Sequence, residues 1–224
     1  LTLKKNYMSN FFYPLVENPY SSDDIKEGIK VLKSKQLTIS NKTRIFENKF
    51  STKLKSKHAL MVNSGSSANL LALQCLINPY RKNRLSRGDE VIIPTLCWST
   101  SLWPIIQSGL KPIFIDIDEN SLNIDENQIE KQITKKTKAI LLVHVLGNSC
   151  NLDQIIRIKK KYNLILIEDT CESLGSKFKN KYLGTFGEFS SFSFYSSHQI
   201  SSGEGGMICC QNAEDYNIIK SLRS

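Results

Sequence analysis

The segment at residues 191–206, SFSFYSSHQISSGEGG, places one histidine between a run of aromatic and hydroxyl residues and a glycine-rich turn. Histidine is the side chain whose ordinary pKa lies closest to neutral pH, so a lone imidazole can serve as a general base. Ser193, five residues before His198, offers a hydroxyl that could donate to a phosphate. An isolated histidine is more often structural than catalytic, and this segment by itself leaves both interpretations open.

A second stretch, NSGSSAN at residues 63–69, follows the apolar run ALMV and precedes a helical pattern. Small residues at the start of a helix let backbone N–H groups approach an anion, which the positive end of the helix also attracts. The hydroxyl of Ser66 adds a further donor. The stretch therefore predicts a phosphate-binding turn, although a plain turn with a serine cap would have the same sequence.

Residues that suit a flat aromatic ligand follow two other apolar runs. Trp98 comes just after EVIIP, and its indole can stack on a heteroaromatic ring. Glu168 and Asp169 end the run LILIED, and because strand side chains alternate, only one carboxylate can face a given site, where it can keep a pyridine nitrogen protonated. A core tryptophan and a capping or surface carboxylate are the alternatives for each residue alone. Taken together in chain order, these groups describe a pyridoxal-phosphate site.

Apolar runs alternate with helical patterns along the part of the chain that must position these residues. Strands are expected at 59–62, 90–94, 111–117, 138–145 and 164–169, with a helical pattern after each of the first four. Continuous apolar strands alternating with helices predict an α/β fold, a mostly parallel sheet with helices on both faces, whose ligands bind at the carboxyl ends of the strands. We expect an N-terminal helical segment at 1–58 and a large α/β domain at 59–224.

Composition excludes several classes of protein. No apolar stretch approaches the roughly 20 residues of a membrane span, and the opening LTLKKNYMSN lacks the apolar core of a signal peptide. The six cysteines show no CxxC spacing, which is typical of reduced thiols in a cytoplasmic protein. The net charge of +9 lies mostly in the first 60 residues as scattered lysines, a pattern that favours a solvated surface over nucleic-acid binding.

Beyond these arguments, the chain resembles the DegT-type sugar aminotransferase family, which has fold type I of the pyridoxal-phosphate enzymes. The resemblance rests on NSGSSAN, GDEVIIP, GLKPIFIDID, IEDTCESLGS and FSFYSSHQISSGEGG. It implies that Gly65, Ser66 and Ser193 bind the phosphate, that Trp98 stacks on the ring and that Asp169 faces the ring nitrogen. It also implies a homodimer with the site at its interface, and a smaller C-terminal domain that this chain does not include.

The position of His198 departs from the aminotransferase pattern. In those enzymes the last motif reads S-F-x-x-x-K, and its lysine carries the cofactor as an imine; counted from Ser193, that position is His198. The chain is thus similar to the branch that dehydrates nucleotide sugars at C3, such as CDP-4-keto-6-deoxyglucose 3-dehydrase and GDP-4-keto-6-deoxymannose 3-dehydratase. The resemblance implies a pyridoxamine phosphate (PMP) held without a covalent bond, His198 as the base at its C4′ carbon, and a role in deoxysugar synthesis for lipopolysaccharide O-antigen.

Several questions stay open at this level. Glu172 stands where the family usually places a glutamine near the ring hydroxyl, which leaves its cofactor contact in question. Cys171 stands where the CDP-sugar enzyme uses a cluster cysteine, which implies a 2Fe-2S cluster and a reductase partner, whereas the GDP-sugar enzyme regenerates its cofactor with glutamate; the segments EDTC and VLGN favour the former. An ordinary aminotransferase would need a lysine near His198, and none lies between Lys181 and Lys220. A non-catalytic sugar- or cofactor-binding relative could also lack the lysine.

Overall fold

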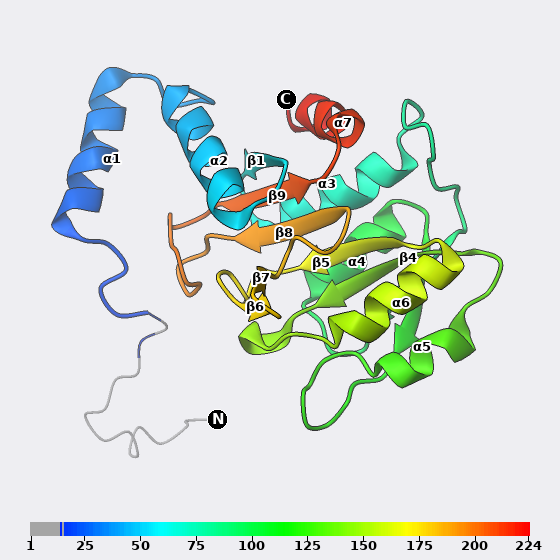
Figure 1. The fold of residues 1–224 in the computed structure, drawn as a ribbon. Helices are drawn as coiled ribbons and strands as arrows, with labels where there is room; N and C mark the ends of the chain where they lie inside the picture. The colour runs from blue at the N-terminus through cyan, green and yellow to red at the C-terminus, as the bar shows by residue number, and fades with distance from the viewer. Residues whose placement is uncertain (1–13, 15) are drawn as a thin grey trace, which may run out of the picture.

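A seven-stranded sheet between two layers of helices forms the centre of the computed structural model, which describes residue 14 and residues 16–224 (Figure 1). Residues 1–13 and 15 of the predicted helical segment 1–58, including LTLKKNYMSN, lie outside the described residues. In spatial order the strands are β1 (His58–Val62), β9 (Gly206–Cys210), β8 (Phe189–Ser193), β5 (Ile165–Asp169), β4 (Thr137–Val143), β2 (Glu90–Pro94) and β3 (Lys111–Ile115).

The sheet is mostly parallel, which confirms the expectation from the apolar runs. Strands β3, β2, β4, β5 and β8 run in one direction. Strand β9 is antiparallel to both of its neighbours, β8 and β1. The first strand of the chain, β1, is thus paired with the last, β9. The carboxyl ends of β4, β5 and β8 therefore meet at one edge of the sheet, where ligands of such folds bind.

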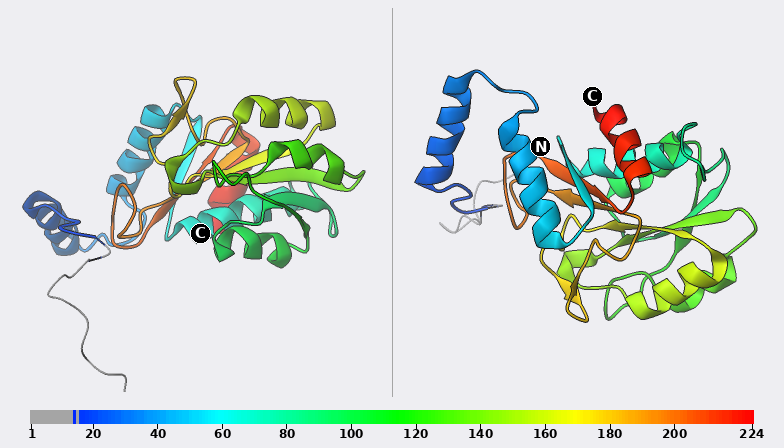
Figure 2. Two further views of the ribbon diagram at one scale, coloured as in Figure 1. Left: turned by 90° about the horizontal axis from the view of Figure 1, so that it is seen from below. Right: turned by 45° about the horizontal axis from the view of Figure 1, so that its top comes forward.

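Helices cover both faces of the sheet because side chains on each strand alternate between the two sides. Val91 and Ile93 pack in one core cluster, whereas Ile92 between them packs in another on the opposite face. The helices on the first face are α3 (Gly65–Ile77), α4 (Ser99–Gln107) and α7 (Ala213–Arg223). Those on the second face are α2 (Asn41–Leu54), α5 (Glu126–Gln132) and α6 (Leu152–Tyr162) (Figure 2).

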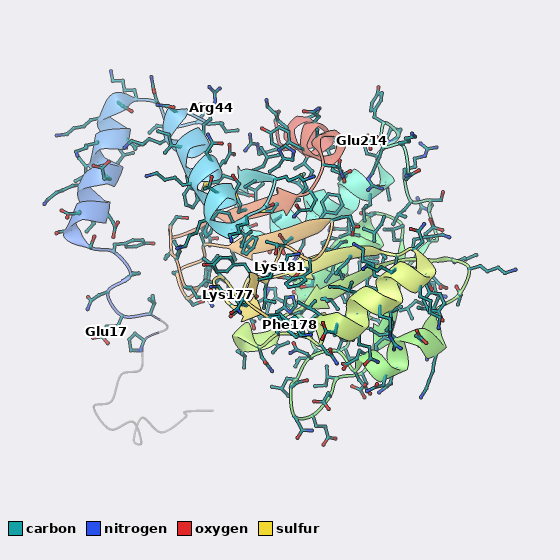
Figure 3. All side chains as sticks on the ribbon, viewed as in Figure 1. Glu17, Arg44, Lys177, Phe178, Lys181 and Glu214 are labelled. Carbon is teal, nitrogen blue, oxygen red and sulfur yellow. The ribbon has the colours of Figure 1, made fainter. Side chains whose placement is uncertain are left out.

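The remaining elements are peripheral. Helix α1 (Ser22–Ser34) begins with a capping box formed by Ser21 and Asp24, has no buried residue and lies beside the sheet assembly rather than on it (Figure 1). β6 (Lys177–Phe178) and β7 (Lys181–Tyr182) form a short hairpin, whose Lys177, Phe178 and Lys181 are labelled in Figure 3. Lys177 lies over the Tyr182 ring and Lys181 over the Phe186 ring. One turn of 3-10 helix, η1 (Val145–Gly147), follows β4. None of the helices in the described part of the chain has the length and apolarity that a membrane crossing requires.

Candidate functional site

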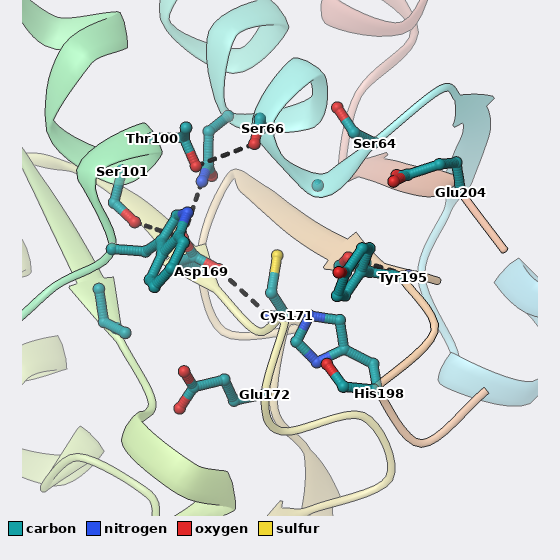
Figure 4. A pocket seen from close by; sticks show the side chains of 16 residues that line it. Ser64, Ser66, Thr100, Ser101, Asp169, Cys171, Glu172, Tyr195, His198 and Glu204 are labelled. Carbon is teal, nitrogen blue, oxygen red and sulfur yellow. Dashed lines mark hydrogen bonds between the residues drawn. The ribbon is translucent and has the colours of Figure 1, made fainter. Parts of the chain in front are cut away.

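A cavity of about 380 Å³ lies at the carboxyl ends of β4, β5 and β8 (Figure 4). The structure brings together at this cavity every residue that the sequence analysis selected for a site: Gly65, Ser66, Trp98, Asp169, Cys171, Glu172, Ser193 and His198. They come from segments spread between positions 65 and 198 of the chain, so their meeting follows from the parallel sheet and not from sequence proximity.

The N-terminus of α3 forms one wall of the cavity. Ser64 caps the helix by accepting the N–H of Ser67 at 3.1 Å, while the N–H groups of Gly65 and Ser66 in the first turn have no acceptor within the helix. The hydroxyl of Ser66 donates to Thr100 Oγ1 at 2.9 Å, which ties α3 to the start of α4. Free amides at the positive end of a 13-residue helix are suited to bind a phosphate.

Two glycines allow this helix to start so close to the sheet. A Cβ at Gly65 would lie 2.6 Å from Cys171 Sγ and 2.9 Å from Ser193 Cβ. A Cβ at Gly206 would lie 2.3 Å from the carbonyl carbon of Ser64 and 2.4 Å from its oxygen. The helix N-terminus, Ser193 of β8 and the start of β9 can therefore form a common cradle only with glycine at both positions.

Asp169 is the carboxylate of β5 that faces the cavity. It lies on the α3 and α4 side of the sheet, and its Oδ2 accepts hydrogen bonds from Asn69 Nδ2 and Ser101 Oγ, both at 2.7 Å. Its Oδ1 accepts the N–H of Cys171 at 3.2 Å. The side chain is only 5% exposed, so a bound ring nitrogen would meet this carboxylate in a largely water-free environment.

Glu168, the preceding residue, points to the opposite face, as strand alternation predicts. Its carboxylate is fully buried and accepts three backbone N–H groups, from Gly184 at 2.8 Å and from Phe186 and Gly187 at 2.7 Å. His144 Nε2 lies 3.2 Å from the same carboxylate, while His144 Nδ1 accepts the N–H of Cys150, so the ring proton sits on Nε2. Glu168 thus fixes the loop between β7 and β8 and takes no part in the cavity.

Trp98 and Glu172 also line the cavity. Trp98 is 72% exposed at the N-cap of α4, an unusual degree of exposure for an indole, and its ring is therefore accessible to a stacking partner. Glu172 Oε2 accepts the N–H of Leu146 at 2.6 Å, and the backbone oxygen of Glu172 accepts Gln199 Nε2 at 2.6 Å. Glu172 therefore links the turn after β4 to the loop that carries His198.

His198 lies in the loop between β8 and β9. Its N–H donates to the Tyr195 carbonyl at 3.0 Å, and its ring meets the Tyr195 ring edge-on with 6.3 Å between centroids. Figure 4 shows the imidazole within the cavity, beside Tyr195 and Cys171. No lysine of the described part of the chain lines the cavity.

Some cavity residues were not found from the sequence. Asn69, Thr100, Ser101 and Tyr195 line the cavity, although none of them has a motif that distinguishes it from an ordinary polar residue. The positions of three of them, Asn69, Thr100 and Ser101, did carry a signal. Asn69 lies one helical turn after Gly65 and so shares its face, and Thr100 and Ser101 open a helix that follows a strand of the sheet.

Cys171 is the candidate cluster ligand among the cavity residues. Burial is the main cause that raises the pKa of its thiol well above the usual range, with the nearby Asp169 carboxylate adding to the effect. Within the described residues, no three histidine, cysteine, aspartate or glutamate side chains form a group suited to a metal ion. The cluster stays a prediction that this chain's residues do not test.

Comparison with known proteins gives a consistent picture. The profile of the DegT/DnrJ/EryC1/StrS aminotransferase family matches residues 20–224. Similar curated proteins include GDP-4-keto-6-deoxy-D-mannose 3-dehydratase of Escherichia coli O55:H7, 42% identical over 95% of this chain and 54% of that protein. Another is the lipopolysaccharide biosynthesis protein RfbH of Salmonella typhimurium, 44% identical over 84% of this chain and 43% of that protein.

Solved structures agree with these relatives. E. coli GDP-4-keto-6-deoxy-D-mannose-3-dehydratase with bound hydrated pyridoxal phosphate (PLP) superposes with a TM-score of 0.91 at 42% identity, over 95% of this chain and 54% of the other. The Helicobacter pylori aminotransferase PseC superposes with a TM-score of 0.84 at 32% identity, over 92% and 54%. The chain spans about half the length of the curated relatives it matches.

Proposed function

The chain belongs to the DegT/DnrJ/EryC1/StrS aminotransferase family, and on that premise we propose that it acts as a PMP-dependent 3-dehydratase of a nucleotide-linked 4-keto-6-deoxyhexose. One observation carries the proposal: the cavity that contains Trp98 and Asp169 also contains His198, and no lysine of the described residues. An imidazole cannot form the stable imine by which an aminotransferase lysine holds PLP. The proposal therefore needs a cofactor held by other contacts.

The residues around the cavity fit a phosphate-bearing pyridine ring. The α3 cradle that would take the phosphate exists only because Gly65 and Gly206 lack a Cβ. Trp98 offers an exposed ring face for stacking, and Asp169 offers a buried carboxylate. Phosphate, ring face and ring nitrogen thus each have a partner, and structures related to this chain contain PLP. We assign the phosphate to Gly65, Ser66 and Ser193 on these grounds.

When bound, PMP supplies a primary amine that condenses with the 4-keto group and a ring that accepts electrons. Asp169 keeps the ring nitrogen protonated, and Trp98 holds the ring in place by stacking on its face. Glu172, whose carboxylate accepts the N–H of Leu146, lines the same cavity and would be the partner of the ring hydroxyl. These residues would hold the cofactor in the same cavity that His198 lines.

His198 carries out the proton transfer. Its imidazole would take the proton from the cofactor C4′ carbon, and the bound cofactor would supply the electron pair that expels the C3 hydroxyl of the sugar. The imidazolium then gives the same proton to the departing hydroxyl, which leaves as water, so that protons and charge balance. Acid–base assistance of this kind is worth roughly 10²–10⁴-fold in rate.

The expected substrate is a CDP- or GDP-linked sugar, and the names of relatives favour GDP. Two of the similar curated proteins are GDP-4-keto-6-deoxy-D-mannose 3-dehydratases. A related structure of that enzyme contains a trapped PLP–glutamate geminal diamine, which supports glutamate as the amino donor that regenerates PMP. The similarity to the lipopolysaccharide biosynthesis protein RfbH favours a role in lipopolysaccharide synthesis. We further propose that the protein is a cytoplasmic homodimer and that its large domain spans residues 59–224.

The iron–sulfur alternative is a separate proposal. Cys171 would be the one ligand supplied by this chain for a 2Fe-2S cluster, with a reductase as partner. Iron and sulfide analysis of the purified protein, together with its visible absorbance, tests it directly. An iron-free protein that dehydrates its substrate and is regenerated by glutamate alone would exclude the cluster.

The experiment that tests the main proposal replaces His198 with asparagine. We expect His198→Asn to lose roughly 10²–10⁴-fold in the dehydration of GDP-4-keto-6-deoxymannose, because the amide cannot accept the proton. Cofactor absorbance should persist, since the phosphate and ring contacts remain. His58→Asn is the matched control, because His58 stacks on Tyr216 and does not line the cavity. A wild-type rate in His198→Asn would exclude this role for His198, and absence of any turnover in the wild type would favour a non-catalytic relative.

A further inference from the structure

The carboxylate of Asp169 is held by one side chain from each of two helices (Figure 4). Asn69 of α3 and Ser101 of α4 both donate to Asp169 Oδ2 at 2.7 Å. Asn69 is 1% exposed and Ser101 is fully buried, so water does not compete for either bond. Short hydrogen bonds to an ionised acceptor in such surroundings are among the stronger ones in proteins.

These two bonds determine which oxygen is free for a ligand. A carboxylate offers about four lone-pair positions, and Oδ2 uses two of them on Asn69 and Ser101. Oδ1 receives only the N–H of Cys171, at the longer distance of 3.2 Å. The remaining lone pair of Oδ1 is therefore the acceptor position that the protein leaves open.

The charge of Asp169 has no cationic partner among the described residues. The salt bridges of that part of the chain leave it out, and only neutral donors surround it. A buried carboxylate without a counter-charge is costly, and hydrogen bonds from neutral groups offset only part of that cost. A protonated ring nitrogen placed at Oδ1 would supply the missing positive charge.

The orientation of Asn69 points the same way. Its Oδ1 is buried and accepts no hydrogen bond from the described residues, while its Nδ2 donates to Asp169. The reverse orientation would place an amide carbonyl against a carboxylate, and the two oxygens would repel each other. Among the described residues the Asn69 carbonyl has no hydrogen-bond partner, whereas its amide N–H donates to Asp169. The main structural role of this side chain is therefore the hydrogen bond to Asp169.

We propose that Asn69 and Ser101 are positioning residues that hold the Asp169 carboxylate turned so that Oδ1 meets the protonated ring nitrogen of the cofactor. The inference rests on the proposed function, because it assumes that a pyridine ring binds in this cavity. Without the two donors the carboxylate can rotate, and Oδ1 then turns away from the ring nitrogen. The ring nitrogen then loses its proton more readily, and the ring becomes a weaker electron sink.

The test follows the ring nitrogen itself in the full-length holoenzyme. The protein is loaded with cofactor labelled with ¹⁵N in the ring, and the ¹⁵N chemical shift is recorded against pH for the wild type, Asn69→Leu and Ser101→Ala. We expect the wild-type nitrogen to stay protonated through neutral pH and each variant to lose the proton at least about one pH unit lower. In the same variants kcat should fall about tenfold or more, while KM for the sugar changes by less than about threefold.

Gln74→Leu is the matched control for a purely structural effect. Gln74 Nε2 donates to Ser108 Oγ at 3.0 Å, so it also joins α3 to α4 by an amide–hydroxyl bond, but it does not line the cavity. This variant should keep the wild-type ¹⁵N titration. Equal shifts in Gln74→Leu and Asn69→Leu, or an unchanged titration in both Asn69→Leu and Ser101→Ala, overturn the inference.

The outcomes separate this inference from the proposed function. A wild type whose bound cofactor has a protonated ring nitrogen, with the expected shifts in the variants but no dehydration of any nucleotide sugar, supports the inference and refutes the dehydratase. Dehydration by a wild type whose ring nitrogen is unprotonated at neutral pH refutes the inference alone. A wild type that takes up no cofactor overturns both.

Discussion

Replacing Gly206 with alanine should damage both the stability of the protein and its phosphate cradle. The new Cβ would lie 2.3 Å from the carbonyl carbon of Ser64, 2.4 Å from its oxygen and 2.7 Å from the nitrogen of Gly65, whereas ordinary contacts begin near 3.4 Å. All three atoms belong to the backbone, so no side chain can rotate away. The separation between β9 and the start of α3 must therefore grow by about 1 Å, the shortfall between those distances.

The sheet leaves little freedom for such a movement. Gly206 pairs with Val62 on one side and with Ser193 on the other, so β9 cannot shift without disturbing two ladders. The helix N-terminus must move instead, which takes the N–H groups of Gly65 and Ser66 away from the proposed phosphate position. Overpacking costs about 1–3 kcal/mol, and the fixed backbone on both sides places this substitution at about 3 kcal/mol. For a protein of this size that corresponds to a fall in Tm of about 6–12 °C.

Thermal unfolding followed by circular dichroism, with and without cofactor, measures both effects. Gly28→Ala is the control, because Gly28 lies within α1 and a Cβ there meets nothing within 4 Å. Alanine favours a helix over glycine by about 1 kcal/mol, so this variant should not lower the Tm. The cradle argument is wrong if Gly206→Ala unfolds at the same Tm as the wild type and binds the cofactor with unchanged affinity.

Three further predictions concern residues around the cavity. Glu168→Gln should lower the free energy of unfolding in urea by about 3 kcal/mol, because a buried acceptor of three N–H groups loses its charge. The control Asp153→Asn, on the exposed surface, should change that free energy by less than about 0.5 kcal/mol. Similar values for the two variants would contradict the role of Glu168. Burial raises the pKa of the Cys171 thiol, and only the thiolate reacts with iodoacetamide. Alkylation of Cys171 should therefore be slow at neutral pH and become faster as the pH rises. Rapid modification at pH 7, followed by mass spectrometry, would count against this. Trp98→Ala should weaken cofactor binding about tenfold through the loss of stacking. The control Trp103→Phe should leave cofactor binding unchanged, because Trp103 does not line the cavity. An absorbance titration measures both affinities, and equal values would show that Trp98 does not stack.

The strands were the most predictable part of the fold. The apolar runs at 90–94 and 164–169 correspond closely to β2 and β5, because strands buried on both faces leave an unbroken apolar signal. The sequence did not indicate that β9 would lie between β8 and β1 in the antiparallel sense. Pairing between segments so far apart in the chain depends on the helices that fill the space, and no local pattern records it.

The site was predictable where a single residue type determines the chemistry. The alternation of strand side chains assigned Glu168 and Asp169 to opposite faces, and the structure confirms it. The bond from Leu146 to Glu172 was not predictable, because Leu146 adopts a left-handed backbone conformation (φ +52°) that its side chain does not favour. Asn69 was missed for another reason: its partner lies 100 residues away, and only the packed α3 and β5 reveal it.

The closeness of Ser64, Gly65 and Gly206 has a consequence for the order of events during synthesis. A chain leaves the ribosome from its N-terminus, so the first strand and α3 are made long before β9. Among the described residues, β1 pairs only with β9, and Gly206 at the start of β9 lies directly against the start of α3. A nascent chain that has not yet reached β9 therefore already contains every residue that lines the cavity, but it lacks the strand against which the start of α3 packs, so the proposed phosphate site can form only late in synthesis.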